Sequence, residues 1–189
     1  MTEVSYYPEI TRFIEMQLQS NFRAKNQDDI RIYWKIGEMK SKIEELINEH
    51  PAECKCLKTF ARKMPPLNVD IFAVITNGIK FELFILEVKL LKSVGLAQWS
   101  QLIGYCIVAD CKYGLLINID GGASNRLVEM LRQNADVSKI IRLKEHYQIK
   151  SQLGFMQWNS ITKNFEYSGL GQLGSLSFIS NELINQFRE

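Results

Sequence analysis

The sequence predicts an α/β fold in which helices flank a mixed central β-sheet. Segments with a helical spacing of apolar residues alternate with segments rich in β-formers, in the expected order αβαββαβαβ. An Asn-Gly pair at residues 77–78 separates two β-rich runs, which is the strongest short-range hairpin signal. The run at 113–119 is largely apolar, as expected for a strand that is covered on both faces.

The first fifty residues predict a helix, a strand and a second helix. Apolar residues recur at helical spacing over 6–22, and Pro8 is acceptable in a first turn. Residues 30–36 alternate between apolar and polar side chains, which is the period of a strand. Helical spacing returns over 38–49, and Pro51 stops that helix.

The β-rich runs on either side of the Asn-Gly pair, residues 69–76 and 79–90, predict a hairpin. The later elements are, in order, a helix over 95–109, a strand over 113–119, a helix over 123–133, a strand over 139–143 and a final helix over 180–188. Strands and turns are expected between the last two of these. A chain of 189 residues suits one domain, residues 1–189.

The composition is that of an ordinary soluble protein, with 46% hydrophobic and 23% charged residues. The formal net charge of +2 does not by itself indicate a nucleic-acid partner. No apolar run reaches the roughly 18 residues of a spanning helix, so no membrane partner is expected, and the N-terminus lacks the pattern of a signal peptide. The spacing of the four cysteines is not that of a disulfide framework, which favours reduced thiols in an intracellular, cytoplasmic protein.

Three charged residues share one face of the hairpin if its turn is a two-residue loop. Asp70 then lies opposite Ile85, and Asn68 opposite Glu87. Since the same face returns at every second residue, Asp70, Glu87 and Lys89 point to one side, and a symmetric lengthening of the turn leaves this unchanged. Asp70 and Glu87 become diagonal neighbours with Cα atoms about 7–8 Å apart.

The negative charges of Asp70 and Glu87 need a compensating positive charge at this position. The hairpin is otherwise apolar on both faces, which indicates burial in the centre of a sheet, where unpaired acids are costly. A divalent cation held by Asp70 and Glu87 would compensate them, and Mg²⁺ suits hard oxygen ligands completed by water. The alternative is a frayed strand end at which Asp70 simply pairs with Lys89.

These residues resemble the active-site motif of the PD-(D/E)XK nuclease superfamily, which includes restriction endonucleases, Holliday-junction resolvases and RecB-type nuclease domains. Asp70, in Asn-Val-Asp, resembles the PD half, with Val69 in place of the proline. Glu87 to Lys89 resembles the E-x-K half. The helix after this strand carries Gln101 and Tyr105, similar to a Q-x-x-x-Y element. The resemblance covers about residues 6–120, which leaves 121–189 as an elaboration of the same domain.

Glu9, in the first helix, resembles the helix-borne glutamate that approaches the metal in many members of the superfamily. The alternative for Glu9 is a solvated acid favoured by the helix dipole.

The resemblance implies a restriction-endonuclease-like fold and a Mg²⁺-dependent nuclease, with Mn²⁺ as a substitute, that hydrolyses phosphodiester bonds in DNA rather than RNA. It implies a metal held by Asp70, Glu87, the backbone carbonyl of Val88 and Glu9. Lys89 would orient the attacking water and stabilise negative charge. Gln101 would bond near the metal or the phosphate, and Tyr105 would share that helix face.

A basic run precedes the strand that carries Asp70. Lys58, Arg62 and Lys63 have no acid near them in the sequence, and we expect them to contact nucleic-acid phosphates. No ATP-binding motif occurs, so any unwinding of a duplex must come from a partner.

The alternatives concern substrate and class. A branched junction or RNA could replace linear DNA, and a homodimer is one open oligomeric state. The chain could also be a catalytically silent nuclease-fold module that binds nucleic acid, or a viral structural protein with a fortuitous motif.

Overall fold

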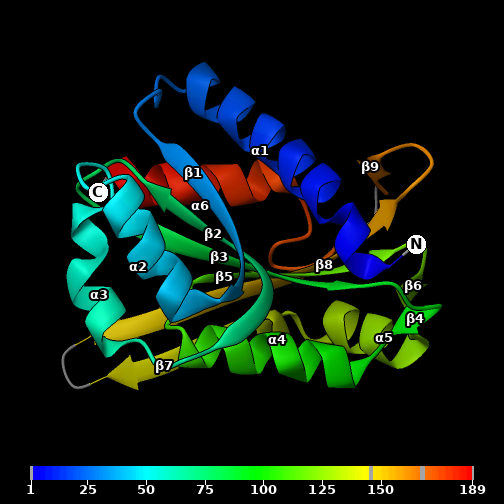
Figure 1. Cartoon of the computed structure of the whole chain (residues 1–189). Coiled ribbons are helices and arrows are strands. Elements are labelled where there is room, and N and C mark those ends of the chain that lie inside the picture. Colours follow the sequence, from blue (N-terminus) through cyan, green and yellow to red (C-terminus); the bar gives the residue numbers. More distant parts are fainter. Residues whose placement is uncertain (1, 145–146, 167–168, 189) are drawn as a thin grey trace.

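A computed structural model describes residues 2–144, 147–166 and 169–188 of the chain (Figure 1). Its helices are η1 (Glu3–Tyr6), α1 (Tyr7–Ala24), α2 (Met39–Glu49), η2 (Lys55–Leu57), α3 (Lys58–Lys63), α4 (Leu96–Val108), α5 (Asn125–Gln133), η3 (Ala135–Ser138) and α6 (Leu176–Arg188). Its strands are β1 (Arg31–Glu38), β2 (Asn68–Thr76), β3 (Phe81–Lys89), β4 (Ser93–Val94), β5 (Tyr113–Ile119), β6 (Gly122–Ala123), β7 (Lys139–Lys144), β8 (Tyr147–Asn159), β9 (Asn164–Phe165) and β10 (Leu170–Gly171).

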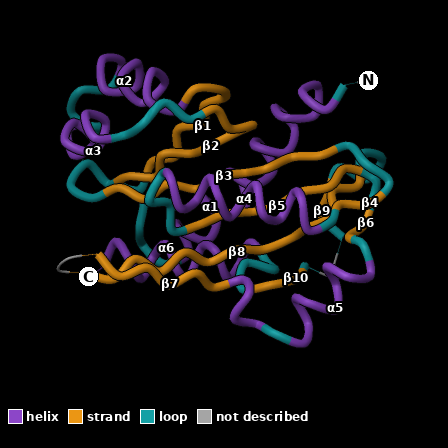
Figure 2. Tube along the Cα trace, turned by 90° about the horizontal axis from the view of Figure 1, so that it is seen from below, coloured by secondary structure: helices purple, strands orange, loops and turns teal. Residues whose placement is uncertain are grey.

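The central sheet is mixed, which confirms the predicted α/β class. Its strands follow the order β1-β2-β3-β5-β8-β10, and Figure 2 shows the first five side by side. The β1–β2 and β2–β3 pairs are antiparallel, whereas β3, β5 and β8 are parallel to one another. Parallel neighbours need a crossover, and α4 provides the one from β3 to β5. The carboxyl ends of β3, β5 and β8 therefore meet at one edge of the sheet.

Helices cover both faces of this sheet (Figure 1). The helices α1 and α6 pack on one face, against side chains such as Phe84 and Leu86 of β3. The helices α2, α3, α4 and α5 belong to the core on the other face, which includes Leu83 and Ile85 of the same strand. Because both faces of β3 are covered, residues 83–88 are all buried, as the apolar pattern predicts. No helix in the described part of the chain is long and apolar enough to cross a membrane.

The predicted hairpin is present, but its turn is longer than two residues. Thr76 pairs with Phe81, so residues 77–80 form a four-residue loop. The Asn77 side chain accepts hydrogen bonds from the backbone N–H groups of Ile79 and Lys80, which closes the loop locally.

The longer turn corrects the predicted register. Ile85 pairs with Phe72 rather than with Asp70, and the last pair of the ladder is Ile71 with Leu86. Val69 and Phe72 lie in the core on one face of the sheet and Ile71 in the core on the other, so the side chains of β2 do not alternate regularly through Asp70. The prediction that parity puts both acids on one face therefore does not extend to Asp70.

A bulge in β2 lies at Asp70. Lys35 of β1 pairs with Phe72, but Gly37 pairs with Val69, so two residues of β2 oppose a single residue of β1. Gly37 has a φ of +96°, a conformation that glycine adopts without strain. A bulge twists and re-aims its strand, so β2 turns away from the regular ladder where it presents Asp70.

The last third of the chain completes the same sheet. The strand β8 runs for 13 residues and pairs with β5, while α6 packs against α1. The sequence predicted the helix α5 and the strand β7 here, left strands and turns unspecified after β7, and placed the start of the final helix at 180 rather than at Leu176. It also missed the short helix α3.

We predict opposite stability effects for two glycine-to-alanine changes. A Cβ at Gly154 of β8 would collide with the backbone carbonyl of Leu173, so Gly154→Ala should lower the free energy of unfolding by about 1–3 kcal/mol. A Cβ at Gly104 in α4 meets nothing within 4 Å, so Gly104→Ala should raise it by about 0.5–1 kcal/mol. Urea unfolding of both variants measures the two signs. A neutral Gly154→Ala would show that β8 is not packed as described.

Candidate active site

The acidic cluster lies where β3 reaches its carboxyl end. Asp70 Oδ2 accepts hydrogen bonds from the backbone N–H of Val88 at 3.0 Å and from Lys89 Nζ at 2.9 Å. Asp70 therefore inserts its carboxylate beside β3 at the point where the β2–β3 ladder ends. Its other oxygen, Oδ1, makes no hydrogen bond among the described residues.

Glu87 is fully buried beside Asp70. Its Oε1 lies 2.6 Å from Lys89 Nζ, in an ion pair whose angles fall outside hydrogen-bond geometry, and Oε2 has no partner in the described part of the chain. Burial, strengthened by the negative charge of Asp70, raises the pKa of Glu87 to about 7 even though the Lys89 ammonium opposes the shift. A carboxylate with this pKa is poorly compensated by the protein alone.

Lys89 stands between the two carboxylates. Its Nζ contacts both Asp70 Oδ2 and Glu87 Oε1, so these oxygens are no farther apart than the sum of the two contact distances. Burial by itself would lower the pKa of Lys89, but the two carboxylates outweigh it and raise the pKa above its ordinary value. The ammonium is the positive charge that holds the pair together.

The N-terminal segment adds two residues that sequence reasoning missed. Glu3 Oε1 lies 4.0 Å from Lys89 Nζ and accepts a hydrogen bond from the Tyr7 hydroxyl at 2.9 Å. Burial, followed by the charges of Asp70 and Glu3, raises the pKa of the Tyr7 hydroxyl, which stays protonated and donates. The four-residue spacing of Glu3 and Tyr7 is the only sequence signal of this pair.

Glu9, the predicted helix-borne ligand, is not brought to the cluster. It forms an ion pair with Lys163 Nζ at 2.7 Å. Glu9 follows Tyr7 by two residues, which is a rotation of about 200° around α1, so it points away from the face on which Tyr7 meets the acids. Glu3 is the N-terminal acid that approaches Lys89 instead.

Gln101 and Tyr105 are joined by a hydrogen bond on the surface of α4. Gln101 Nε2 donates to the Tyr105 hydroxyl at 2.7 Å, one helical turn apart, as their shared face predicts. Within the described residues no hydrogen bond or ion pair joins either of them to the acidic cluster.

The helix α3, which carries the basic residues Lys58, Arg62 and Lys63, packs toward the other end of β3 from the acidic cluster, and their contact with phosphates stays a prediction. The helix α3 packs its Phe60 against Phe81 with ring centroids 5.2 Å apart. Phe81 begins β3 and Lys89 ends it, eight residues later, so the two ends are separated by about 26 Å. Figure 1 shows α3 on the left and the cluster's edge of the sheet on the right.

Buried Asn118 fixes the loop that follows Lys89. Its Nδ2 donates to the carbonyls of Leu91 and Gly122, and its Oδ1 accepts from the Leu91 N–H. This amide on β5 ties the chain just beyond β3 to the neighbouring strand. Lys89 is thus held by regular structure on one side and by a pinned loop on the other. An asparagine near the end of an apolar strand is the sequence signal that was overlooked.

The cluster fits a metal that needs few protein ligands. The described residues contain no group of three or more His, Cys, Asp and Glu side chains arranged to bind a metal. Asp70 and Glu87 make a smaller donor set, and Glu87 Oε2 is a buried oxygen that lacks a partner among the described residues. Mg²⁺ keeps several waters and is often held by one or two carboxylates, so this set suits it.

We predict that Glu87 makes the metal-free protein less stable as pH rises. Its pKa is about 7 when folded and close to 4.5 when unfolded, so between these values the folded protein keeps a proton that the unfolded chain has lost. The free energy of unfolding should fall across this interval and Glu87→Gln should flatten the fall. Thermal unfolding in EDTA measures the slope, with Glu129→Gln, an exposed acid on α5, as the control. An identical slope in Glu87→Gln would assign the effect to another group.

Comparison of the chain with protein-family models, with curated proteins and with solved structures finds no match in any of the three. The candidate site therefore rests on its own geometry and on the short motifs in the sequence.

Proposed function

We propose that the protein is a Mg²⁺-dependent nuclease that hydrolyses phosphodiester bonds in DNA. The observation that carries this proposal is the pair of carboxylates, Asp70 and a fully buried Glu87, on either side of Lys89 at the carboxyl edge of the sheet. DNA is favoured over RNA because restriction endonucleases and Holliday-junction resolvases, whose motif these residues resemble, act on DNA.

The cluster is difficult to explain as a device for stability. A buried ion pair gains little over a well-packed apolar substitute, and each buried oxygen without a partner costs about 1–3 kcal/mol. Glu87 has such an oxygen and a pKa raised to about 7. Strongly perturbed acids held against a specific charge are typical of functional sites.

Each residue has a separate role in the proposed reaction. Asp70, Glu87 and the Val88 carbonyl would hold Mg²⁺ or Mn²⁺, which when bound supplies positive charge and lowers the pKa of a ligated water. Lys89 donates hydrogen bonds from a charge that solvent screens little, because its side chain is only 18% exposed. An ammonium so placed can orient the attacking water and stabilise negative charge on the phosphate.

Glu3 and Tyr7 position this ammonium. With a cation held by the two carboxylates, Lys89 would need another acceptor, and Glu3 is the next carboxylate within reach. The Tyr7 hydroxyl fixes Glu3 in that place from a buried position on α1. These two residues bind no metal in this account.

We predict that cleavage depends on all three residues of the cluster. Wild type should cut linear or branched DNA with Mg²⁺ or Mn²⁺ and not with EDTA. Asp70→Asn, Glu87→Gln and Lys89→Met should each slow cleavage on the order of 10²-fold or more, since each removes a charge that acts in the transition state. Gel assays on single-stranded, duplex and four-way-junction DNA and on RNA measure the rates.

The matched controls are Lys92→Met and Glu129→Gln, which alter exposed residues outside the cluster and should cut like wild type. Metal-independent DNA binding without cleavage would favour the silent module. Cleavage by Asp70→Asn at the wild-type rate would show that the acidic cluster is not the active site.

A separate prediction concerns metal affinity. The Lys89 ammonium competes with any cation that binds both carboxylates, so Lys89→Met should bind Mn²⁺ about tenfold more tightly, or about 1.4 kcal/mol, despite losing cleavage. Calorimetric titration well above the pKa of Glu87 measures this, with Lys92→Met as the reference. Weaker binding in Lys89→Met would mean that the ammonium supports the metal rather than competing with it.

A further inference from the structure

The basic run at the α3 end of the molecule has no role in the proposed catalytic site. Lys55, Lys58, Arg62 and Lys63 are all exposed, and no side-chain hydrogen bond or ion pair to another described residue engages any of them. The helix α3 packs against Phe81, which lies about 26 Å from Lys89 along β3, and no ion pair or hydrogen bond joins these basic residues to the cluster in the described part of the chain. Four unpaired cations on one short segment indicate an anionic partner.

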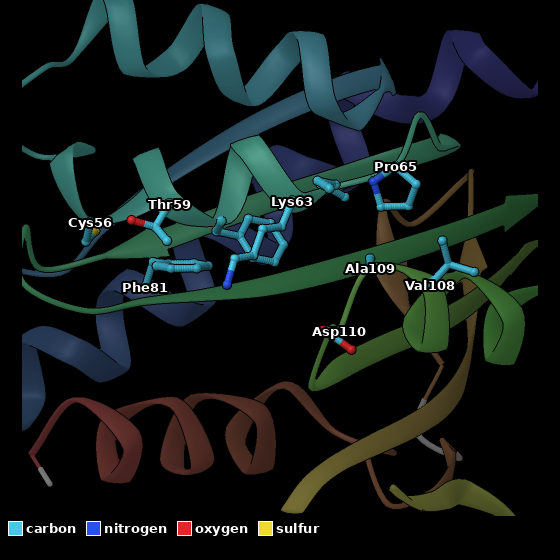
Figure 3. Close-up of a pocket in the computed structure, with 10 residues that line it drawn as sticks. Cys56, Thr59, Lys63, Pro65, Phe81, Val108, Ala109 and Asp110 are labelled. Carbon is cyan, nitrogen blue, oxygen red and sulfur yellow. The ribbon is translucent and has the colours of Figure 1, made fainter. Parts of the chain in front are cut away.

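A hollow of about 320 Å³ opens beside this run. Figure 3 shows Lys63, Phe81 and Val108 around it, from three elements that are far apart in the sequence. Its wall is largely apolar and includes Phe60 and Met64. Val108 is 47% exposed, so part of this apolar wall faces solvent.

A second hollow, of about 410 Å³, adjoins the first. Cys56 and Phe81 line both, and the second also includes Ile79, Lys80 and Lys112. Ile79 is 81% exposed at the tip of the β2–β3 turn. We call the two hollows together the α3 groove. Its lining consists of apolar side chains with lysine side chains between them.

The charge available in this groove is positive. Its acids are already engaged, since Asp110 pairs with Arg142 at 2.9 Å and Glu82 pairs with Lys112. Lys63 and Lys80 take part in no ion pair with a described residue. The groove therefore complements a segment that carries both negative charge and a large apolar side chain.

We propose that the α3 groove binds an acidic protein segment that inserts an apolar side chain between α3 and the start of β3. A peptide fits the walls better than a nucleic acid. Met64 and Val108 offer no flat face for a base, and the rings of Phe60 and Phe81 are tilted by 58° rather than forming a stacking platform. Because the groove and the acidic cluster lie at opposite ends of β3, partner and substrate bind together. The proposal does not depend on the catalytic one.

The test is fluorescence anisotropy of the whole protein with a labelled synthetic peptide in which Asp and Glu flank a Leu-Phe pair. We expect binding in the micromolar range, and a loss of at least about tenfold, or about 1.4 kcal/mol, when serine replaces Leu and Phe. The double change Lys58→Glu and Lys63→Glu, and separately Val108→Glu, should each weaken binding by a similar factor. The double change Arg23→Glu and Lys25→Glu, at exposed sites near the end of α1, is the matched control and should bind like wild type.

Thermal unfolding of each variant separates loss of binding from loss of fold, because all the altered side chains are exposed. Three results would overturn the proposal: no binding of the peptide by wild type, equal binding by the groove variants and the control, or displacement of the peptide by single-stranded DNA that binds more tightly. The last result would make the groove a nucleic-acid surface. Nuclease activity should be unchanged in Val108→Glu, so failure here leaves the proposed catalysis untouched.

Discussion

Lys89 Nζ lies 2.6 Å from Glu87 Oε1 and 2.9 Å from Asp70 Oδ2, and the geometry of the candidate site depends on this cation between two carboxylates. Glu87 is fully buried, so its charge needs a partner that the neighbouring apolar side chains cannot supply. The β2 bulge aims Asp70 at Val88 and Lys89, and Asn118 pins the loop beyond β3. These features give the two acids and the lysine fixed positions at the carboxyl edge of a rigid sheet.

This arrangement favours function over stability. Glu87 keeps an oxygen without a partner in the described chain, and its pKa of about 7 shows that one ammonium does not fully compensate two carboxylates. The apolar packing of helices on both faces of β3 stabilises the fold and offsets the unfavourable burial of Glu87. A divalent cation would supply the charge that the protein lacks and would free Lys89 for another acceptor. The proposed nuclease chemistry rests on this electrostatic imbalance.

Local patterns predicted the regular elements and the order of the hairpin strands. Parity placed Asp70, Glu87 and Lys89 on one face, but it could foresee neither the four-residue turn closed by hydrogen bonds to Asn77 nor the bulge at Asp70, which depends on pairing with β1. Helical periodicity identified α1 but not the preceding turn that brings Glu3, rather than Glu9, to Lys89. The packing of Phe60 of α3 against Phe81 at the start of β3 is a tertiary contact, which the nearness of the basic run to Asp70 in the sequence could not reveal. The length of β8 depends on its pairing with β5, which is a tertiary contact.

The central claim is that Asp70 and Glu87 share a divalent cation, and a crystal structure grown with Mn²⁺ tests it most directly through the anomalous signal of the metal. The account predicts one Mn²⁺ bonded at about 2.1 Å to oxygens of both Asp70 and Glu87. It also predicts that Lys89 Nζ moves from between the carboxylates toward Glu3. A structure at saturating Mn²⁺ in which Lys89 still bridges the two acids and no metal contacts either of them would contradict the account.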